Sequence, residues 1–328
     1  MIDRRAFVAM VGGSILARPF AAQAQQPAKV YRIGYFTVPS RETAQGVANS
    51  FQLALRDLGW IEGKNIAVDY RFADSRLDRL PDLAAELARQ ADVIVAGANA
   101  AVIAAKNATR TIPIVMFLAI DPVGSGLVAS LARPGGNVTG LTATAGREIY
   151  GKQLQLLKDA FPQVSRVTIL VSQVSAVDPR AVPEIESATR ALQLKPQVVR
   201  IRDAGELDEV FAGFATTHPD AIYVSADSMF YQHRARLAQL AAKSRLPAMW
   251  GLRDYAEAGG LMAYSTDLHD LARRAAGYVD KILKGAKPAD LPVEQPTKFD
   301  FVINMKTAKT LGLTIPQSVL IRADEIIQ

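Results

Sequence analysis

The sequence contains no cysteine, and it has few of the other side chains that build reactive or metal-binding centres. Among 328 residues there are three histidines. The missing cysteines exclude disulfides, a thiolate nucleophile, a thiolate metal site and a lipid-modified cysteine. His218, His233 and His269 stand far apart and show no zinc-ligand spacing. We therefore expect neither a bound metal nor a cofactor.

Sequence motifs for phosphate binding and nucleophilic catalysis are missing as well. There is no Walker loop, no G-x-S-x-G elbow and no G-x-G-x-x-G after a strand. Gly135-Gly136 follows a proline and is typical of a turn. Acidic pairs such as Glu184/Glu186 fall on amphipathic helices, where solvated carboxylates are common. These absences argue against an enzyme.

Long apolar runs and basic blocks are also absent. No run approaches the roughly 18 apolar residues that a membrane span needs. The formal net charge is +6, but the basic residues are scattered, so no nucleic-acid surface is predicted. With 49% hydrophobic and 21% charged residues, the chain has the composition of a globular protein with two cores.

The first 24 residues have the pattern of an export signal. Arg4-Arg5 precedes a short apolar stretch, and Ala22-Gln23-Ala24 matches an A-x-A cleavage site. The arginine pair resembles a twin-arginine signal, although Asp3 stands where Ser or Thr is usual, so the general secretory route stays open. A plain apolar helix is the alternative. We predict removal of residues 1–24 and a soluble protein in the periplasm.

Short apolar strand patterns alternate with helical patterns from Tyr31 onward. This alternation predicts parallel sheets with helices on both faces. Strands are expected at 31–36, 66–72, 93–96, 114–118, 166–171, 197–202, 221–224, 248–250, 261–264 and 300–303. Helices are expected at 181–192, 207–216, 230–243 and 271–283, and Ser40 is the expected N-cap of an earlier one. Further helices are expected around 80–87, up to Ala108 and just before Gly312.

One strand–helix–strand unit occurs twice. Residues 92–99 (DVIVAGAN) are echoed by 220–227 (DAIYVSAD), and each is followed by a helix ending in Ala-Ala-Lys and a proline-led strand. Chance similarity between two β-α-β units is the alternative explanation. If the repeat is real, it predicts two similar lobes and places Asn99 of one lobe opposite Asp227 of the other.

The polar and aromatic residues at the strand ends are the candidate ligand-binding residues. Ligands of open parallel sheets bind beyond the carboxyl ends of the strands, where helix N-termini offer free N–H groups. An amide and a carboxylate there suit an amino acid, although each is equally explained as a helix cap, and aromatic residues are also ordinary core residues. The predicted ligand-binding residues are Phe36, Ser40, Asn99, Phe117, Ser172, Asp227, Ser228, Trp250, Arg253 and Tyr264.

Several segments carry a family resemblance. They are DPVG at 121–124, LARPGGNVTG at 131–140, EAGGLM at 257–262, KILKG at 281–285 and KPADLPVE at 287–294. These segments resemble the ABC-transporter substrate-binding proteins of the tryptophan/tyrosine type, from about Tyr31 to the C-terminus. The resemblance implies a type I periplasmic-binding-protein fold. That fold has two doubly wound, Rossmann-like α/β lobes, joined by a hinge and separated by a ligand cleft.

The resemblance also implies how the chain is divided. Crossings between lobes are expected at 138–144, 250–253 and 298–300. Lobe 1 would then hold residues 29–141 and 252–299, and lobe 2 residues 142–251 and 300–328. By the same likeness, an acid at the strand end of Asp227 takes the ligand amine. The loop 172–178 departs from the Asn-Pro-rich form common in relatives, which leaves the identity of the ligand open.

The function implied is that of a periplasmic solute-binding component of an ABC importer. It would work as a monomer with a membrane-embedded permease, and its lobes would close on a small carboxylate-bearing ligand, an amino acid or an aromatic acid. A ligand-sensing protein for a receptor is the alternative, and an α/β enzyme is a weaker one. The export signal and the lack of a DNA-binding domain disfavour a repressor, and the missing cofactor glycines disfavour an enzyme.

Overall fold

The computed structural model describes residues 29–144, 146, 148–173 and 181–328. Residues 31–328 form one unit, which is described by itself below. The predicted signal segment 1–24 and most of the loop 172–178 lie outside the described residues. In the part of the chain that is described, no helix is both long and apolar enough to cross a membrane.

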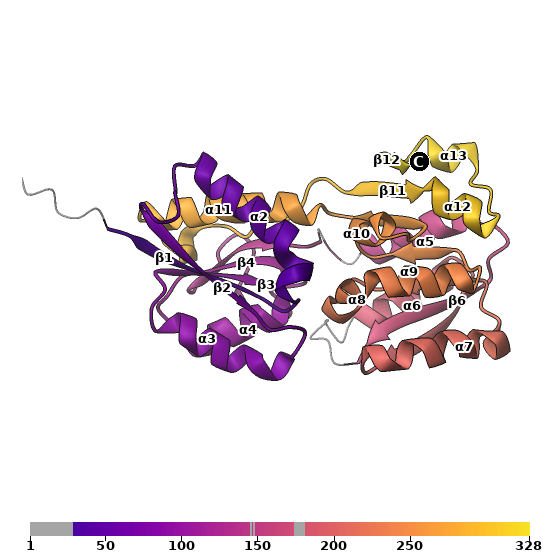
Figure 1. Cartoon of the computed structure of the whole chain (residues 1–328), viewed down its shortest axis with the longest axis horizontal. Coiled ribbons are helices and arrows are strands. Elements are labelled where there is room, and N and C mark those ends of the chain that lie inside the picture. Colours follow the sequence, from indigo (N-terminus) through magenta and orange to yellow (C-terminus); the bar gives the residue numbers. More distant parts are fainter. Residues whose placement is uncertain (1–28, 145, 147, 174–180) are drawn as a thin grey trace, which may run out of the picture. The chain divides into compact units, whose positions relative to one another are not determined.

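A five-stranded parallel sheet forms the first lobe (Figure 1). In sheet order its strands are β2 (Ile66–Phe72), β1 (Tyr31–Thr37), β3 (Val93–Gly97), β4 (Ile114–Ala119) and β5 (Val138–Thr142). Helices α2 (Arg41–Asp57) and α11 (Leu268–Leu283) pack side by side on one face, and α3 (Leu80–Ala88) and α4 (Ala98–Ala108) cover the other. Because successive residues of a strand face opposite sides, Tyr35 packs under α2 and Phe36 under α3 and α4.

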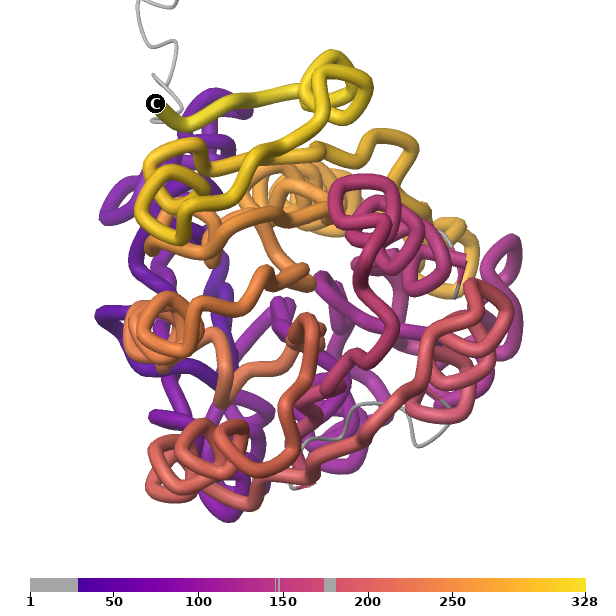
Figure 2. Tube along the Cα trace, turned by 90° about the vertical axis from the view of Figure 1, so that its right-hand side faces the viewer, coloured from indigo at the N-terminus to yellow at the C-terminus, as the bar shows by residue number. Residues whose placement is uncertain are grey.

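A seven-stranded sheet forms the second lobe. Its order is β12 (Glu325–Ile327), β11 (Asp300–Asn304), β10 (Met262–Ser265), β9 (Ala248–Trp250), β8 (Ala221–Val224), β6 (Arg166–Ser172) and β7 (Lys195–Ile201). In Figure 2 helices flank it on both sides. Helices α5 (Glu148–Ala160) and α6 (Ala181–Ala191) cover one face, and α7 (Leu207–Thr217), α9 (Arg234–Lys243) and α10 (Arg253–Glu257) the other. The antiparallel pairing of β11 with β10 interrupts the parallel order.

Short elements complete the second lobe and the connections. They are α8 (Ser228–Gln232), α12 (Met305–Leu311), α13 (Gln317–Leu320) and the 3-10 turns η1 (Leu77–Arg79), η2 (Ala204–Glu206) and η3 (Pro288–Asp290). The helix expected at 230–243 is thus two helices, α8 and α9, separated at His233. Helices α5, α10 and α13 and strands β5 and β12 have no counterpart among the expected elements.

The predicted internal repeat is real at the level of topology. The order β2-β1-β3-β4-β5 of the first sheet recurs as β7-β6-β8-β9-β10 in the second. Asp92 and Asp220, which open the two repeated segments, also make the same contact. The carboxylate of each accepts a backbone hydrogen bond of 2.8 Å from the strand beside it, from Arg32 and Arg166 respectively.

The second crossing between lobes lies later than expected. Residues 252–265 were assigned to lobe 1, but β10 pairs with β9 and β11 in the second sheet. The chain returns to the first lobe between Ser265 and Leu268, where α11 begins. The boundary therefore lies near 266 rather than 252, because β10 holds the place in the second sheet that β5 holds in the first. The chain also passes between the two sheets between 142 and 148 and between 294 and 300, where crossings at 138–144 and 298–300 were expected.

Candidate ligand-binding site

A cavity of about 640 Å³ lies between the two lobes, beyond the carboxyl ends of strands from both sheets. Its volume falls within the usual range for small-molecule sites. The first lobe contributes Tyr35, Thr37–Pro39, Ala44, Val47, Ser75–Asp78, Ala98–Ala100, Phe117, Leu118, Ile120 and Leu268. The second contributes Ser172, Arg202–Ala204, Ala226–Met229, Tyr231, His233 and Leu252, and Ala143 lies in the connection.

An aromatic cluster forms the first-lobe wall of the cavity. The ring of Tyr35 lies 5.4 Å from that of Phe51 and 5.8 Å from that of Phe117. Gly97 allows this packing, because a Cβ atom there would lie 2.9 Å from Thr37 Oγ1 and 3.0 Å from the Phe117 ring. The side chains of this wall are thus held by their neighbours before any ligand arrives.

Two strand ends at the cavity have a left-handed backbone at non-glycine residues. Ala98, after β3, has φ of 68°, and Leu118, in β4, has φ of 62°. Such conformations cost about 1–3 kcal/mol each and are found most often at functional sites. The turn at Ala98 starts helix α4, whose N-cap Gly97 provides no side-chain cap. The positive end of the α4 dipole therefore faces the cavity.

The Asn99 side chain secures the loop after β4. Its Oδ1 accepts from the Ile120 N–H at 2.8 Å, and its Nδ2 donates to the Ile120 carbonyl at 2.8 Å and to Ser125 Oγ at 3.1 Å. Asn99 was predicted to bind the ligand, and it does line the cavity. Because both of its amide hydrogens are used, it positions the Ile120 loop and offers a ligand at most a second lone pair.

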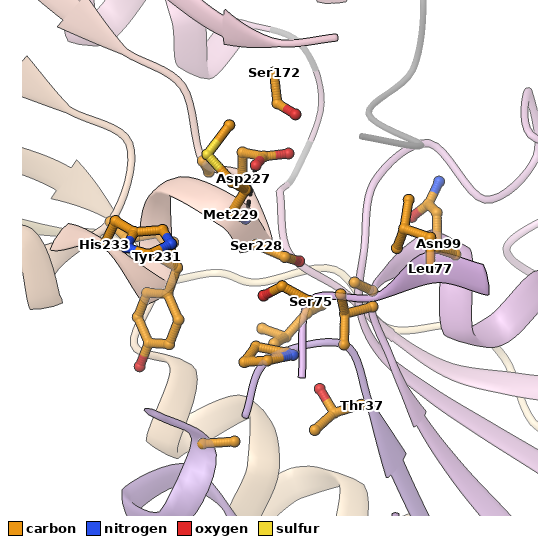
Figure 3. Close-up of a pocket in the computed structure, with 18 of the residues that line it drawn as sticks. Thr37, Ser75, Leu77, Asn99, Ser172, Asp227, Ser228, Met229, Tyr231 and His233 are labelled. Atoms are coloured by element: carbon orange, nitrogen blue, oxygen red, sulfur yellow. Dashed lines mark hydrogen bonds between the residues drawn. The ribbon is translucent and has the colours of Figure 1, made fainter. Parts of the chain in front are cut away.

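Asp227 lies on the second-lobe wall, opposite Asn99 (Figure 3). Its side chain is 5% exposed. Oδ1 accepts hydrogen bonds from the N–H groups of Met229 at 2.8 Å and Phe230 at 3.4 Å, so Asp227 is the N-cap of α8. The residue is therefore both a helix cap and a carboxylate on the cavity wall. Ser228 and Ser172, which were also predicted, line the cavity beside it.

Three predicted aromatic residues do not line the cavity: Phe36 and Trp250 pack inside the cores, and the half-buried Tyr264 packs against one. Phe36 is fully buried among the side chains of α3 and α4. Trp250 is also fully buried and stacks on Tyr255, with ring centroids 5.1 Å apart. Tyr264 stacks on Phe299 at 5.6 Å. Of the four aromatic residues predicted for the site, Phe117 is the one that lines this cavity.

Two predicted polar residues have structural partners away from the cavity. Ser40 caps α2, with its hydroxyl accepting from the Thr43 N–H at 3.3 Å. The guanidinium of Arg253 pairs with Glu257 at 2.9 Å, Asp300 at 3.5 Å and Glu325 at 2.6 Å. Partial burial lowers the pKa of Arg253, but Glu257 and Glu325 outweigh it and raise that pKa above its ordinary value. Arg253 thus ties α10 to β11 and β12.

The loops after the two outer strands β2 and β7 were missed by the sequence prediction. They bring residues 75–78 and 202–204 to the cavity. Each loop leads into a 3-10 turn and then a helix. Each also contains an ion pair, Arg76 with Asp78 in the first and Arg202 with Glu206 in the second. The topological repeat was the available signal, since β7 holds the same place in its sheet as β2.

Tyr231 was also missed, because it lies inside the short helix α8 rather than at a strand end. Its hydroxyl donates to Asp254 Oδ1 at 2.9 Å, and the Arg234 guanidinium lies 4.7 Å from the centre of its ring. Burial, followed by the charge of Asp254, raises the pKa of Tyr231. Its ring is therefore a fixed, neutral surface on the second-lobe wall.

A smaller cavity of about 260 Å³ adjoins the first, and Ile120, Ser172 and Ala226 line both. Polar groups in its wall form hydrogen bonds with other groups of the protein. The Tyr223 hydroxyl donates to Gln153 Oε1 at 2.6 Å, and Gln153 Nε2 donates to the Tyr264 carbonyl at 2.6 Å. Among the described residues, no group of three or more His, Asp or Glu side chains is placed to hold a metal ion.

The chain is similar in sequence to one protein family and to a known relative. Residues 37–327 match the family described as ABC transporter substrate binding protein. A tyrosine-binding protein of Clostridioides difficile (strain R20291) is 24% identical over 286 residues, which are 87% of this chain and 82% of that protein.

Two solved structures are similar over nearly the whole chain. An ABC domain from Streptococcus pneumoniae in complex with L-Trp is 27% identical, with a TM-score of 0.83. A conserved domain protein from Vibrio cholerae is 26% identical, with a TM-score of 0.84. Each comparison covers 91% of this chain and 100% of the other. The predicted fold class is confirmed, and this chain belongs to the family of ABC transporter substrate-binding proteins.

Proposed function

We propose that this protein captures an amino acid or an aromatic acid between its lobes and delivers it to a membrane-embedded ABC permease. The observation that carries the proposal is the placement of three features around one cavity. These are the nearly buried carboxylate of Asp227, the α4 N-terminus without a side-chain cap, and the aromatic wall of Tyr35 and Phe117.

Each feature matches one part of such a ligand. The first-turn N–H groups of α4 suit a carboxylate, because they lack helical partners and lie at the positive end of the helix dipole. Asp227, on the other lobe, suits an ammonium group. The aromatic wall suits an apolar side chain. A ligand that touches both walls binds best when the lobes are close together, which favours hinge closure.

The relatives support the same chemical class. One is a tyrosine-binding protein, and another was solved in complex with L-Trp. A sugar is a poorer match, because its many hydroxyls need more polar partners than the apolar side chains around Tyr35 and Phe117 provide.

A thermal-shift and calorimetry panel tests this function. The panel contains L-tryptophan, L-tyrosine, the amine tryptamine, the acid indole-3-propionate and glucose at matched concentrations. The two amino acids should stabilise the protein most, by about 2.7 kcal/mol at a hundred times Kd. Indole-3-propionate should stabilise it more weakly, and tryptamine and glucose should have no effect. Stabilisation by glucose alone would reject an acid as the ligand.

The site of action we propose is the periplasm, with the protein present as a free monomer. The basis is the export-signal pattern before Gln25. Intact-mass measurement of protein recovered from the periplasm should give a chain that begins at Gln25. A periplasmic chain that still begins at Met1 would contradict cleavage.

A further inference from the structure

Strand β1 brings two hydroxyl groups to the cavity. Tyr35 and Thr37 are two residues apart, so their side chains lie on the same face of the strand, and both line the cavity. Their exposed fractions are 1% and 4%. Across the described ranges, neither hydroxyl has a hydrogen-bond partner within the protein. Both hydroxyl oxygens keep access to the cavity, so they can bond a group that arrives there. A ligand that covers them without bonding them would leave them desolvated, which costs free energy.

The Thr37 hydroxyl lies away from the Asp227 carboxylate in the cavity. In Figure 3, Asp227 and Ser172 lie toward one side of the cavity and Thr37 toward the other. Around Tyr35 the lining is apolar, with Val47 and Leu268 nearby in the same wall. A ligand whose ammonium group faces Asp227 therefore directs its side chain toward Tyr35 and Thr37.

Tyr35 stays neutral, so its hydroxyl can both donate a hydrogen bond to a ligand and accept one from it. Burial raises its pKa well above the ordinary value, and the hydroxyls of Tyr70 and Tyr231 raise it further. Tyr231 has a different role, because its own hydroxyl is already bonded to Asp254. It offers the ligand a ring surface, whereas Tyr35 offers a ring and a hydrogen bond.

We infer that the Tyr35 hydroxyl, with Thr37 beside it, selects ligands whose aromatic ring bears a hydrogen-bonding group, a phenol hydroxyl or an indole N–H. This inference rests on the proposed capture of an amino acid. Phenylalanine and aliphatic amino acids fill the same apolar space but leave both hydroxyls desolvated and unpaired. A site built to bond a ligand's OH or NH rejects the analogue that lacks it, because its own polar groups then stay unpaired.

The test compares L-tyrosine, L-tryptophan and L-phenylalanine by calorimetry on the wild-type protein and on Tyr35→Phe. The wild type should bind the better of tyrosine and tryptophan at least about ten-fold more tightly than phenylalanine. Tyr35→Phe should bring this ratio of affinities close to one, because it lowers the affinity for tyrosine or tryptophan and raises the affinity for phenylalanine. Tyr70→Phe is the matched control, since its ring lies 5.4 Å from Tyr35 but lines no part of the cavity. It should keep the wild-type ratio.

Thr37→Val is a second variant, which removes one of the two hydroxyls without changing the aromatic cluster. It should also lower the ratio of affinities for tyrosine or tryptophan over phenylalanine. It decides the matter if Tyr35→Phe does not fold. Measurable binding with an unchanged ratio in both variants overturns the inference and leaves the proposed function standing. A wild-type preference for phenylalanine does the same. If none of the three amino acids binds, the proposed function fails and the inference fails with it.

Discussion

The hydroxyl of Ser75 donates a hydrogen bond to the side-chain amide oxygen of Gln232 and so joins the two lobes. Ser75 follows β2 in the first lobe and lines the cavity, and Gln232 is the last residue of α8 in the second. The bond exists only while the lobes are close together. It therefore adds stability to that arrangement and none to a separated one.

Removing this bond should favour separated lobes. Ser75→Ala should shift the equilibrium between closed and separated lobes by about 1 kcal/mol, roughly a factor of five. X-ray scattering of the unliganded variant should then show a larger radius of gyration. Ser50→Ala is the matched control, because the Ser50 hydroxyl bonds His269 within the first lobe. Identical curves for Ser75→Ala and wild type would mean that the bond does not influence closure.

Asp227→Asn separates the two roles of that residue. Asparagine keeps an oxygen that can cap α8, so the melting temperature should change little. The loss of negative charge opposite a ligand ammonium should weaken binding by about 2 kcal/mol, as measured by calorimetry. Asp203→Asn, which removes an exposed carboxylate from the cavity wall, should have a smaller effect. Unchanged affinity in Asp227→Asn would leave Asp227 as a helix cap alone.

Arg253→Met tests whether that arginine is structural. Its three carboxylate partners come from α10, β11 and β12, and Asp300 is 10% exposed. Removing the cation should lower the free energy of unfolding by about 2 kcal/mol, as measured by urea denaturation. Ligand affinity should not change, because Arg253 lies outside the cavity. A fall in affinity at full stability would show that Arg253 reaches the ligand.

Asp220 should make the protein sensitive to strong acid. Partial burial raises its pKa, but the N–H groups of Arg166 and Ser165 and the Ser165 hydroxyl outweigh this and lower the pKa from 3.8 to about 2. The folded pKa lies below the unfolded one, so this stabilisation is complete above pH 3.8 and is lost as the pH falls toward 2.

Asp220→Asn should therefore lower stability at neutral pH and flatten its decline between about pH 4 and 2. Chemical denaturation at several pH values measures both effects. Asp82→Asn, at an exposed position on α3, should leave the pH profile as in the wild type. An equally steep decline in the two variants would assign the acid sensitivity to other groups.

Much of the fold could be predicted from local sequence pattern. The strands at 66–72, 221–224 and 248–250 have the bounds that were expected, because short apolar segments between polar turns leave little freedom. The place where the chain changes lobe could not be predicted in this way. A short apolar strand such as β10 would have the same sequence pattern in either sheet. Its neighbours β9 and β11 are set by contacts between distant parts of the chain, which a local pattern does not show.

The site was predictable where it follows strand ends near the middle of each sheet. Asn99 and Asp227 follow β3 and β8, and both reach the cavity. The aromatic residues were harder, because a ring can face either side of its strand. Tyr35 and Phe36 are neighbours in sequence, yet Tyr35 lines the cavity and Phe36 packs beneath α3 and α4. Sequence alone offered no means of choosing between them.

The position of α11 has a consequence for the order in which the lobes are completed during synthesis. Strands β6 to β10 of the second lobe lie in one continuous segment, 166–265. The first lobe begins earlier in the chain, but the face of its sheet that carries Val95 and Val115 packs against α11, which starts at Leu268. A chain growing from its N-terminus therefore exposes that face until the central strands of the second lobe have been made. The core of the first lobe therefore stays open until most of the second lobe has been made, and β11 and β12 then complete the second lobe.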